Sequence, residues 1–291
     1  MSFIDNLSSA IFVHAFKSPT ETIQIRFQSQ EELCRSGILL NKYENLSDCF
    51  NSICLEEGFL TLWKGNLVYV VRYSASQILT IFLKGPISKL KRENPSNNHN
   101  NSGLKNYIHK FLVGTIPIVF PLSIVYPLDV TKVLLINDLN GKYANGLVCL
   151  RNVFQVHGFQ GIYTGFLITI LGAFLYRAIY FALYDAGKSV FCPRNQIDSS
   201  KYLKSFFWGM FVTTVSGIIC YPFDTIRKRM ITSLFTDKPY NGSAECAKSI
   251  WNNEGLKGFF VGAGISVLGG LISTSAQLIY DSCFGKGRKK K

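Results

Sequence analysis

The sequence lacks the residue patterns that mark most enzymes, metal centres and secreted proteins. It contains no CxxC pair, no Ser/His/Asp, paired-carboxylate or metal-binding constellation outside the charged motif described below, and no basic segment followed by a cleavable apolar core at the N-terminus. Acidic residues are also scarce, because 18 Asp and Glu stand against 31 Lys and Arg and leave a net charge of +13. We therefore expect no enzyme activity, no metal and no cofactor, and we expect anionic partners such as lipid head groups or a phosphate-bearing solute.

Apolar residues, in contrast, are abundant. They make up 47% of the 291 residues, and the mean hydropathy of +0.17 is too high for most soluble chains of this size. Three charge-free runs of 18 to 22 residues are each long enough to span a bilayer: 111–128, 205–223 and 259–280. Runs at 66–83 and 165–184 each contain a single arginine, and residues 6–27 complete a sixth span. Since the basic residues are spread among these spans, we exclude a nucleic-acid-binding protein.

A short charged motif occurs three times with the same spacing. We call it the Pro-acid-base motif, and its copies, the first of which has glutamine for the base, are Pro19-Glu21-Gln24, Pro127-Asp129-Lys132 and Pro222-Asp224-Arg227. Each copy is followed by a cysteine and, at the same distance from that cysteine in all three copies, by the glycine of an aromatic-x-Gly sequence. The three repeat cysteines are Cys49, Cys149 and Cys246, and the three repeat glycines are Gly65, Gly165 and Gly262. We predict three copies of one unit, at 1–100, 101–198 and 199–291 with a basic tail, in which the repeat cysteines are packing residues.

Two spans per unit determine the symmetry of the expected fold. Each unit returns the chain to its starting side, so the three units share one orientation and are related by an axis along the membrane normal. The sequence thus predicts an all-α membrane protein with six transmembrane helices and pseudo-threefold symmetry. The three prolines kink their helices, and the kinked segments meet around the axis on one face of the membrane.

Charged residues at the meeting point predict a gate. There the acids Glu21, Asp129 and Asp224 can pair with Lys132, Arg227 and, more weakly, Gln24 of the neighbouring unit. Charges at this depth tend to mark a substrate path, and buried pairs are stable only while both partners are present, so such a ring can open during alternating access. A purely structural belt of salt bridges is the alternative interpretation.

These features resemble the mitochondrial carrier family over nearly the whole chain, and within it the ADP/ATP carriers. The segments that carry the closer resemblance are 63–66, Arg72-Tyr73 with Gln77, 176–181 with 184–185, and 221–230. The resemblance implies termini toward the intermembrane space, three short helices on the matrix side, and strict exchange of ADP for ATP without a metal or covalent intermediate. It also implies the mitochondrial inner membrane, or the membrane of a mitochondrion-derived organelle, with cardiolipin as a lipid partner and a functional monomer.

The family has a second gate, on the cytosolic side, which this chain retains only in part. The aromatic-acid-x-x-base sequence of that gate survives with Asp185 and Lys188 in the second unit, whereas Asp281 of the third unit is followed by Phe284 at the position of the base. In the first unit the acid and the base are both missing. Because the matrix-side gate is better paired, we predict a carrier that rests open to the cytosolic side.

Candidate substrate residues follow from symmetry. Seven residues after each repeat glycine lie Arg72, Gly172 and Gly269, and unequal residues at equivalent positions suit an asymmetric solute. Arg72 is suited to bidentate phosphate contact, whereas Gly172 with Ala173 leaves room for a flat ring and Tyr176 can stack on it. The alternatives are a structural ion pair for Arg72 and close helix packing for Gly172.

Two positions depart from the ADP/ATP carriers. Relatives have an arginine where this chain has Gly269 and a lysine where it has His14, although His14 can be partly protonated near neutral pH. Lys228 and Arg229 extend the basic cluster and can either attract phosphate or bind lipid. The departures keep a second hypothesis open, a carrier of another nucleotide or of a phosphate-bearing coenzyme. A non-transporting scaffold or an anion leak, suggested by the incomplete cytosolic gate, is a third.

Overall fold

The computed structural model describes residues 3–92, 103–191, 199–236 and 238–284, which fold into helices and connecting turns without strands. Six helices are long: α1 (Phe3–Arg35), α3 (Asn66–Arg92), α4 (Gly103–Asn137), α6 (Phe166–Phe191), α7 (Ser199–Thr232) and α10 (Ala263–Phe284). Between the two long helices of each repeat lie shorter elements: α2 (Leu46–Ser52), η1 (Ile53–Glu57), η2 (Phe59–Trp63), α5 (Gly146–Ile162), η3 (Ser233–Phe235), α8 (Ser243–Glu254) and α9 (Leu256–Phe259).

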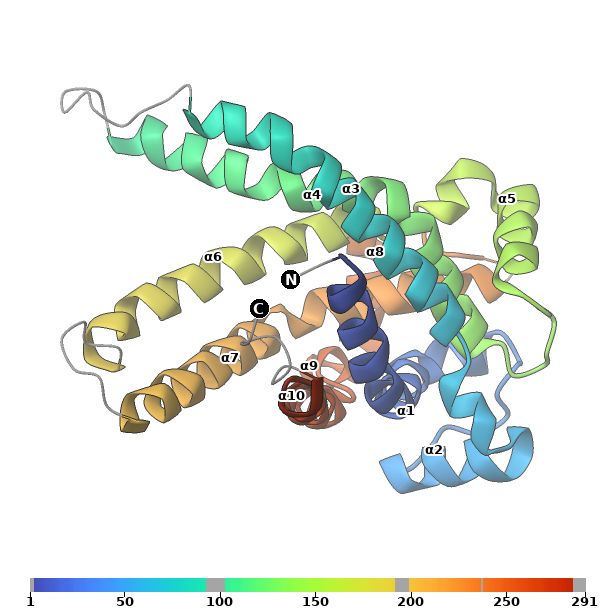
Figure 1. Ribbon diagram of the computed structural model, residues 1–291. Coiled ribbons are helices and arrows are strands. Elements are labelled where there is room, and N and C mark those ends of the chain that lie inside the picture. Colours follow the sequence, from blue (N-terminus) through green and yellow to red (C-terminus); the bar gives the residue numbers. More distant parts are fainter. Residues whose placement is uncertain (1–2, 93–102, 192–198, 237, 285–291) are drawn as a thin grey trace.

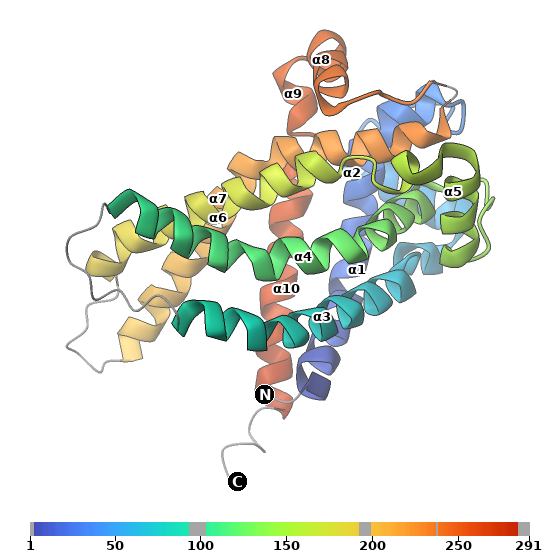
Figure 2. The same ribbon diagram turned by 90° about the horizontal axis from the view of Figure 1, so that it is seen from above.

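The long helices pack as three antiparallel pairs that converge at one end. Helices α3 and α4, α6 and α7, and α10 and α1 lie side by side, so each pair joins the end of one repeat to the start of another (Figures 1 and 2). At the end that carries the short helices, α1, α4 and α7 also contact one another. At the opposite end, the helix pairs α3–α4 and α6–α7 diverge from each other (Figure 1). The bundle is therefore closed on the short-helix side and open on the side of the termini.

Four of the described helical segments are long and apolar enough to span a membrane: Val119–Asn137, Phe166–Gly187, Phe207–Phe235 and Leu256–Phe284. Helices α1 and α3 are 33 and 27 residues long and thus also long enough to span. They are more polar because they carry charged side chains that face the interior of the bundle, including Glu21 and Arg72. The chain is an all-α membrane protein with six long helices in three tandem repeats, as the sequence predicts.

Each kinked helix is fastened to the element that precedes the next long helix of its own repeat. The residue just before each proline donates a hydrogen bond to a backbone carbonyl near the repeat glycine. The bonds are Ser18 Oγ to Leu62 O at 3.1 Å, Tyr126 OH to Thr164 O at 2.7 Å, and Tyr221 OH to Val261 O at 2.8 Å. The glycines themselves have φ angles of 84°, 78° and 78°, in the left-handed region that other residues rarely adopt. This local geometry directs the following helix back across the membrane.

The hydrophobic core lies on the short-helix side. Its three clusters each contain one repeat cysteine, and the three cysteine side chains are completely buried. Burial raises the pKa of all three thiols to about 12, so they remain protonated and unreactive at neutral pH. The repeat cysteines are free thiols that pack the core, in agreement with the prediction.

Candidate substrate site and gate

The three Pro-acid-base motifs meet in a ring, because the last residue of each motif packs on the repeat glycine of another repeat. A Cβ atom placed on each repeat glycine would lie near the Cγ atom of its neighbour: Gly65 at 3.4 Å from Lys132, Gly165 at 3.2 Å from Arg227, and Gly262 at 3.7 Å from Gln24. A larger residue at any of these glycines would separate the kinked helices. The ring follows the repeat order and closes the bundle on the short-helix side.

Glu21 and Lys132 form the ion pair between repeats that the spacing predicts. Lys132 Nζ lies 2.6 Å from Glu21 Oε1. His14 joins them, since its Nε2 lies 3.1 Å from Glu21 Oε2 and 3.2 Å from Lys132 Nζ, while its Nδ1 lies 2.7 Å from Asn66 Oδ1. The imidazole also stacks on Tyr69, with ring centroids 3.4 Å apart. His14, predicted as a substrate contact, is thus part of the gate network in this conformation.

The other two acids of the ring form ion pairs that the sequence did not predict. Asp129 pairs with Arg72 of the neighbouring helix α3, and Asp224 pairs with Lys228 on its own helix, with Nζ and Oδ2 2.7 Å apart. Arg227 feels the charge of both Asp129 and Asp224 but forms no direct ion pair among the described residues. Its Nε and the Oδ2 atom of Asp129 are both buried without a hydrogen-bond partner in that part of the chain.

Gln24 also departs from the expected pairing. Its side-chain amide donates to the hydroxyl of Tyr221 at 3.4 Å instead of bonding to Asp224. Asp224 and Asp129 pair with other residues than expected because closer cations are available to them. Lys228 lies one helical turn from Asp224, and Arg72 projects toward Asp129 from the adjacent helix. Two ion pairs therefore join different helices of the ring, the predicted Glu21–Lys132 pair and the Arg72–Asp129 pair that the spacing did not indicate, whereas Asp224–Lys228 lies within α7.

Directly beside this ring lies a charged cavity of about 400 Å³. Its lining contains four of the ring residues together with Lys17 and Arg72: Val13, His14, Lys17, Glu21, Ile25, Tyr69, Arg72, Asp129, Lys132, Val133, Arg227, Lys228 and Ser273. We call it the basic cavity, because it contains five Lys and Arg side chains against two carboxylates. Such a site favours a multiply charged anion.

A second cavity, of about 350 Å³, shares Arg227 with the basic cavity and is mostly apolar. Gly172, Ala173 and Tyr176 line it together with Phe223. We call it the glycine cavity, and it contains the three residues that symmetry predicted for a flat ring. A Cβ atom on Gly172 would lie 3.3 Å from Phe223 Cβ, so this glycine serves both close helix packing and the cavity.

Arg229, also predicted as a substrate contact, lies away from these cavities. It is completely buried, it donates to both carboxylate oxygens of Glu254, and its Nε donates to the carbonyl of Gln28 at 3.0 Å. Arg26 makes the equivalent contacts in the first repeat, with Glu57 and with the carbonyl of Ile136. The structure therefore gives Arg229 a fastening role between repeats.

This arginine clasp has no counterpart in the second repeat. The positions equivalent to the arginine and the glutamate are Leu134 and His157. Leu134 is buried in the core, and His157 Nε2 lies 3.2 Å from the carbonyl of Leu234. One of the three contacts between repeats is therefore held by a histidine and by apolar packing instead of an ion pair. Arg26 and Arg229 each stand seven residues after the proline of their motif, and this shared position could have indicated the clasp from the sequence.

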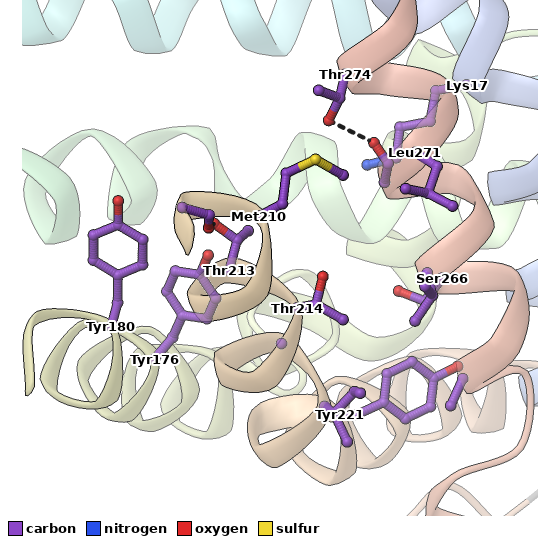
Figure 3. A pocket seen from close by; sticks show the side chains of 16 residues that line it. Lys17, Tyr176, Tyr180, Met210, Thr213, Thr214, Tyr221, Ser266, Leu271 and Thr274 are labelled. Carbon is purple, nitrogen blue, oxygen red and sulfur yellow. Dashed lines mark hydrogen bonds between the residues drawn. The ribbon is translucent and has the colours of Figure 1, made fainter. Parts of the chain in front are cut away.

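At the open end lie two acids of the predicted cytosolic gate. Asp185 and Asp281 are exposed, and neither forms an ion pair among the described residues; Asp281 accepts hydrogen bonds from Gln277 of its own helix, the nearer at 3.1 Å. The side chain of Lys188 lies outside the described residues. A third cavity, of about 640 Å³, lies between α6, α7 and α10, and the tyrosines Tyr176 and Tyr180 project toward it (Figure 3).

Three similar helix pairs, a charged ring at one end of the bundle and a basic cavity beside that ring are features of a membrane transport protein. Comparison with known proteins identifies the family. A family model described as mitochondrial carrier protein matches residues 2–94, 104–195 and 198–286, so the chain belongs to this family, whose members are transporters.

Individual relatives cover almost the whole chain. A protein of Schizosaccharomyces pombe named ADP,ATP carrier protein is 33% identical over 92% of this chain and 85% of its own length. One of Chlamydomonas reinhardtii with the same name is 31% identical over 94% of this chain and 90% of its own length. ADP,ATP carrier protein 3 of Saccharomyces cerevisiae is 29% identical over 98% of this chain and 95% of its own length.

Proposed function

We propose that this protein exchanges ADP and ATP by alternating access across the mitochondrial inner membrane, or across the membrane of a mitochondrion-derived organelle. It works as a monomer, in contact with cardiolipin, and each of the repeats 1–100, 101–198 and 199–291 contributes one motif to the gate. The observation that carries the proposal is the pair of adjoining cavities, one basic and one apolar, with Arg227 in both linings. Together they match a solute with a phosphate tail and a flat ring.

In this proposal the basic cavity binds the phosphates. Arg72 offers a planar guanidinium for bidentate contact, but in the closed ring it is held by Asp129. Phosphate and Asp129 therefore compete for Arg72, and binding removes one of the ion pairs that hold α3 to α4. Substrate binding is in this way coupled to the loosening of the matrix-side gate.

The glycine cavity binds the base in the same proposal. The absence of a side chain at Gly172 lets a planar ring lie against helix α6, and Tyr176 lies one turn further along that helix, on the border of both the glycine cavity and the third cavity. Aromatic stacking supplies affinity for any nucleobase, and the shape of the cavity selects among bases. ADP and ATP share this base, so one site serves both directions of exchange.

Purified protein in liposomes tests this function with a panel of internal and external nucleotides. Saturable uptake of labelled ADP that requires internal ATP or ADP supports it, and uptake of ADP without any internal counter-substrate contradicts strict exchange. A second candidate, a carrier of another nucleotide or of a phosphate-bearing coenzyme, is favoured by Gly269 and by the engagement of His14 in the gate. Exchange of one of those solutes with no exchange of ADP or ATP would select it.

A further inference from the structure

Lys17 is the cation of the site that neither the motif spacing nor the symmetry indicates. It lies on α1, two residues before Pro19, and the equivalent positions of the other repeats are Val125 and Cys220. Its side chain is half-buried and lines both the basic cavity and the third cavity, and it is the residue shared by these two linings. In Figure 3 it extends into the third cavity, which Leu271 and Thr274 of α10 also line.

The ammonium group of Lys17 has no bonded partner among the described residues. The other lysines and Arg72 in the basic cavity each have a carboxylate: Lys132 has Glu21, Arg72 has Asp129 and Lys228 has Asp224. Lys17 feels the charge of Glu21 one turn away, but both oxygens of that carboxylate are already bonded to Lys132 and His14. A half-buried ammonium without a partner gains strongly from an anion in the cavity.

Gly269 explains why Lys17 can occupy this place. A Cβ atom on Gly269 would lie 3.9 Å from Lys17 Cε and 3.1 Å from Thr20 Oγ1, so a side chain there would fill the space along the lysine stem. Gly269 is also the position of α10 that is equivalent to Arg72 of α3. Lys17 of the neighbouring helix α1 thus brings a cation to the part of α10 where Gly269 has no side chain.

We propose that Lys17 binds the phosphate tail of the transported anion and replaces the cation that is missing at Gly269. Arg72, Arg227 and Lys17 then contact the tail from three different helix pairs. This inference rests on the proposed transport of a phosphate-bearing solute, and it assigns a substrate contact to a residue outside the three symmetric positions. The ligand class is a polyphosphate ester with at least two phosphate groups.

The test compares Lys17→Met, which removes the charge, with Lys17→Arg, which keeps it. The matched control is Lys248→Gln, which removes one charge from an exposed lysine of α8 outside the cavities. In reconstituted liposomes we expect K17M to raise KM for the nucleotide about tenfold, the loss typical of one charge-assisted hydrogen bond, while K17R and K248Q stay within about threefold of the wild type. A KM for K17M within about twofold of the wild type overturns the proposal, and so does a K17R variant as impaired as K17M.

A second measurement does not depend on nucleotide transport. Inorganic tripolyphosphate is added to the purified protein in detergent, and the shift of the melting temperature is recorded for the same four proteins. We expect a concentration-dependent stabilisation of the wild type, K17R and K248Q that requires about tenfold more tripolyphosphate in K17M. Equal stabilisation of K17M and the wild type, or no stabilisation of any of them, overturns the assignment of Lys17. If the wild type binds tripolyphosphate more tightly than K17M does but exchanges no nucleotide, the proposed function fails while the assignment of Lys17 as a phosphate contact stands.

Discussion

The arginine clasps make a quantitative prediction about stability. Arg26 is completely buried, and it holds both carboxylate oxygens of Glu57 while its Nε donates to the carbonyl of Ile136 at 2.9 Å. The substitution Arg26→Leu leaves a carboxylate that is only 16% exposed without its partner and leaves the carbonyl unpaired. Removing one partner of a buried pair costs about 3–5 kcal/mol, and we expect R26L to be destabilised by this amount.

The second repeat shows what replaces the clasp when both charges are absent. There the arginine position is Leu134, which is buried in a hydrophobic cluster. We therefore expect the double variant Arg26→Leu/Glu57→Leu to be more stable than R26L, because no carboxylate is left buried and unpaired. The remaining cost is the unpaired carbonyl of Ile136, about 1–3 kcal/mol.

Thermal unfolding in detergent measures these differences. With about 2–4 °C of melting temperature per kcal/mol for chains of 150–250 residues, R26L should melt at least about 6 °C below the wild type, and the double variant should melt above R26L. Arg151→Leu, at an exposed position of α5, is the control and should change stability by no more than about 0.5 kcal/mol. Strictly additive effects of R26L and E57L in the double variant would refute the clasp as a coupled unit.

Three further predictions concern the cavities, the gate and the thiols. Gly172→Leu should fill the glycine cavity and abolish nucleotide exchange while leaving insertion into liposomes intact. The control Gly264→Leu, at a position where an added Cβ meets no atom within 4 Å, should transport normally. Equal transport by both variants would speak against the glycine cavity as a substrate site. Glu21→Gln should lower the melting temperature, because Lys132 is then buried without its partner, and an unchanged value excludes a stabilising gate. The repeat cysteines should resist maleimide from about pH 7 to about pH 9 in the folded protein, because their pKa of about 12 keeps them protonated. The exposed Cys283 should react under the same conditions, and the repeat cysteines should react only after unfolding. Labelling of the repeat cysteines in the folded protein would contradict this prediction.

The repeated spacing was sufficient to predict the fold and the meeting of the three motifs. Proline kinks, repeat glycines and two spans per unit leave one symmetric arrangement, and the packing of Lys132, Arg227 and Gln24 on the repeat glycines follows from it. The cysteine positions likewise identified the core. These features depend on backbone geometry, which the repeat imposes equally on all three units.

The pairing of individual charges could not be predicted in the same way. Asp129 has Arg72 and Arg227 within electrostatic reach, and the choice between them depends on side-chain rotamers and on the distance between helix pairs. Spacing alone also predicted Arg229 as a substrate contact. In the structure Arg229 is bonded to Glu254 of α8, a different element, and spacing within one motif could not indicate that partner. Lys17 breaks the symmetry of the repeat, so a search for equivalent positions passes over it.

The most direct test of the account is the side from which the central site can be reached. Thr213 borders the third cavity, and Thr213→Cys places a thiol there with little change in volume, in a background whose accessible cysteines are replaced by serine. In sealed liposomes with one orientation of the protein, a membrane-impermeant thiol reagent should modify this residue from the side of the termini when no substrate is present. Modification from the short-helix side should appear only during nucleotide exchange. Modification mainly from the short-helix side in the absence of substrate would contradict a closed ring of Pro-acid-base motifs.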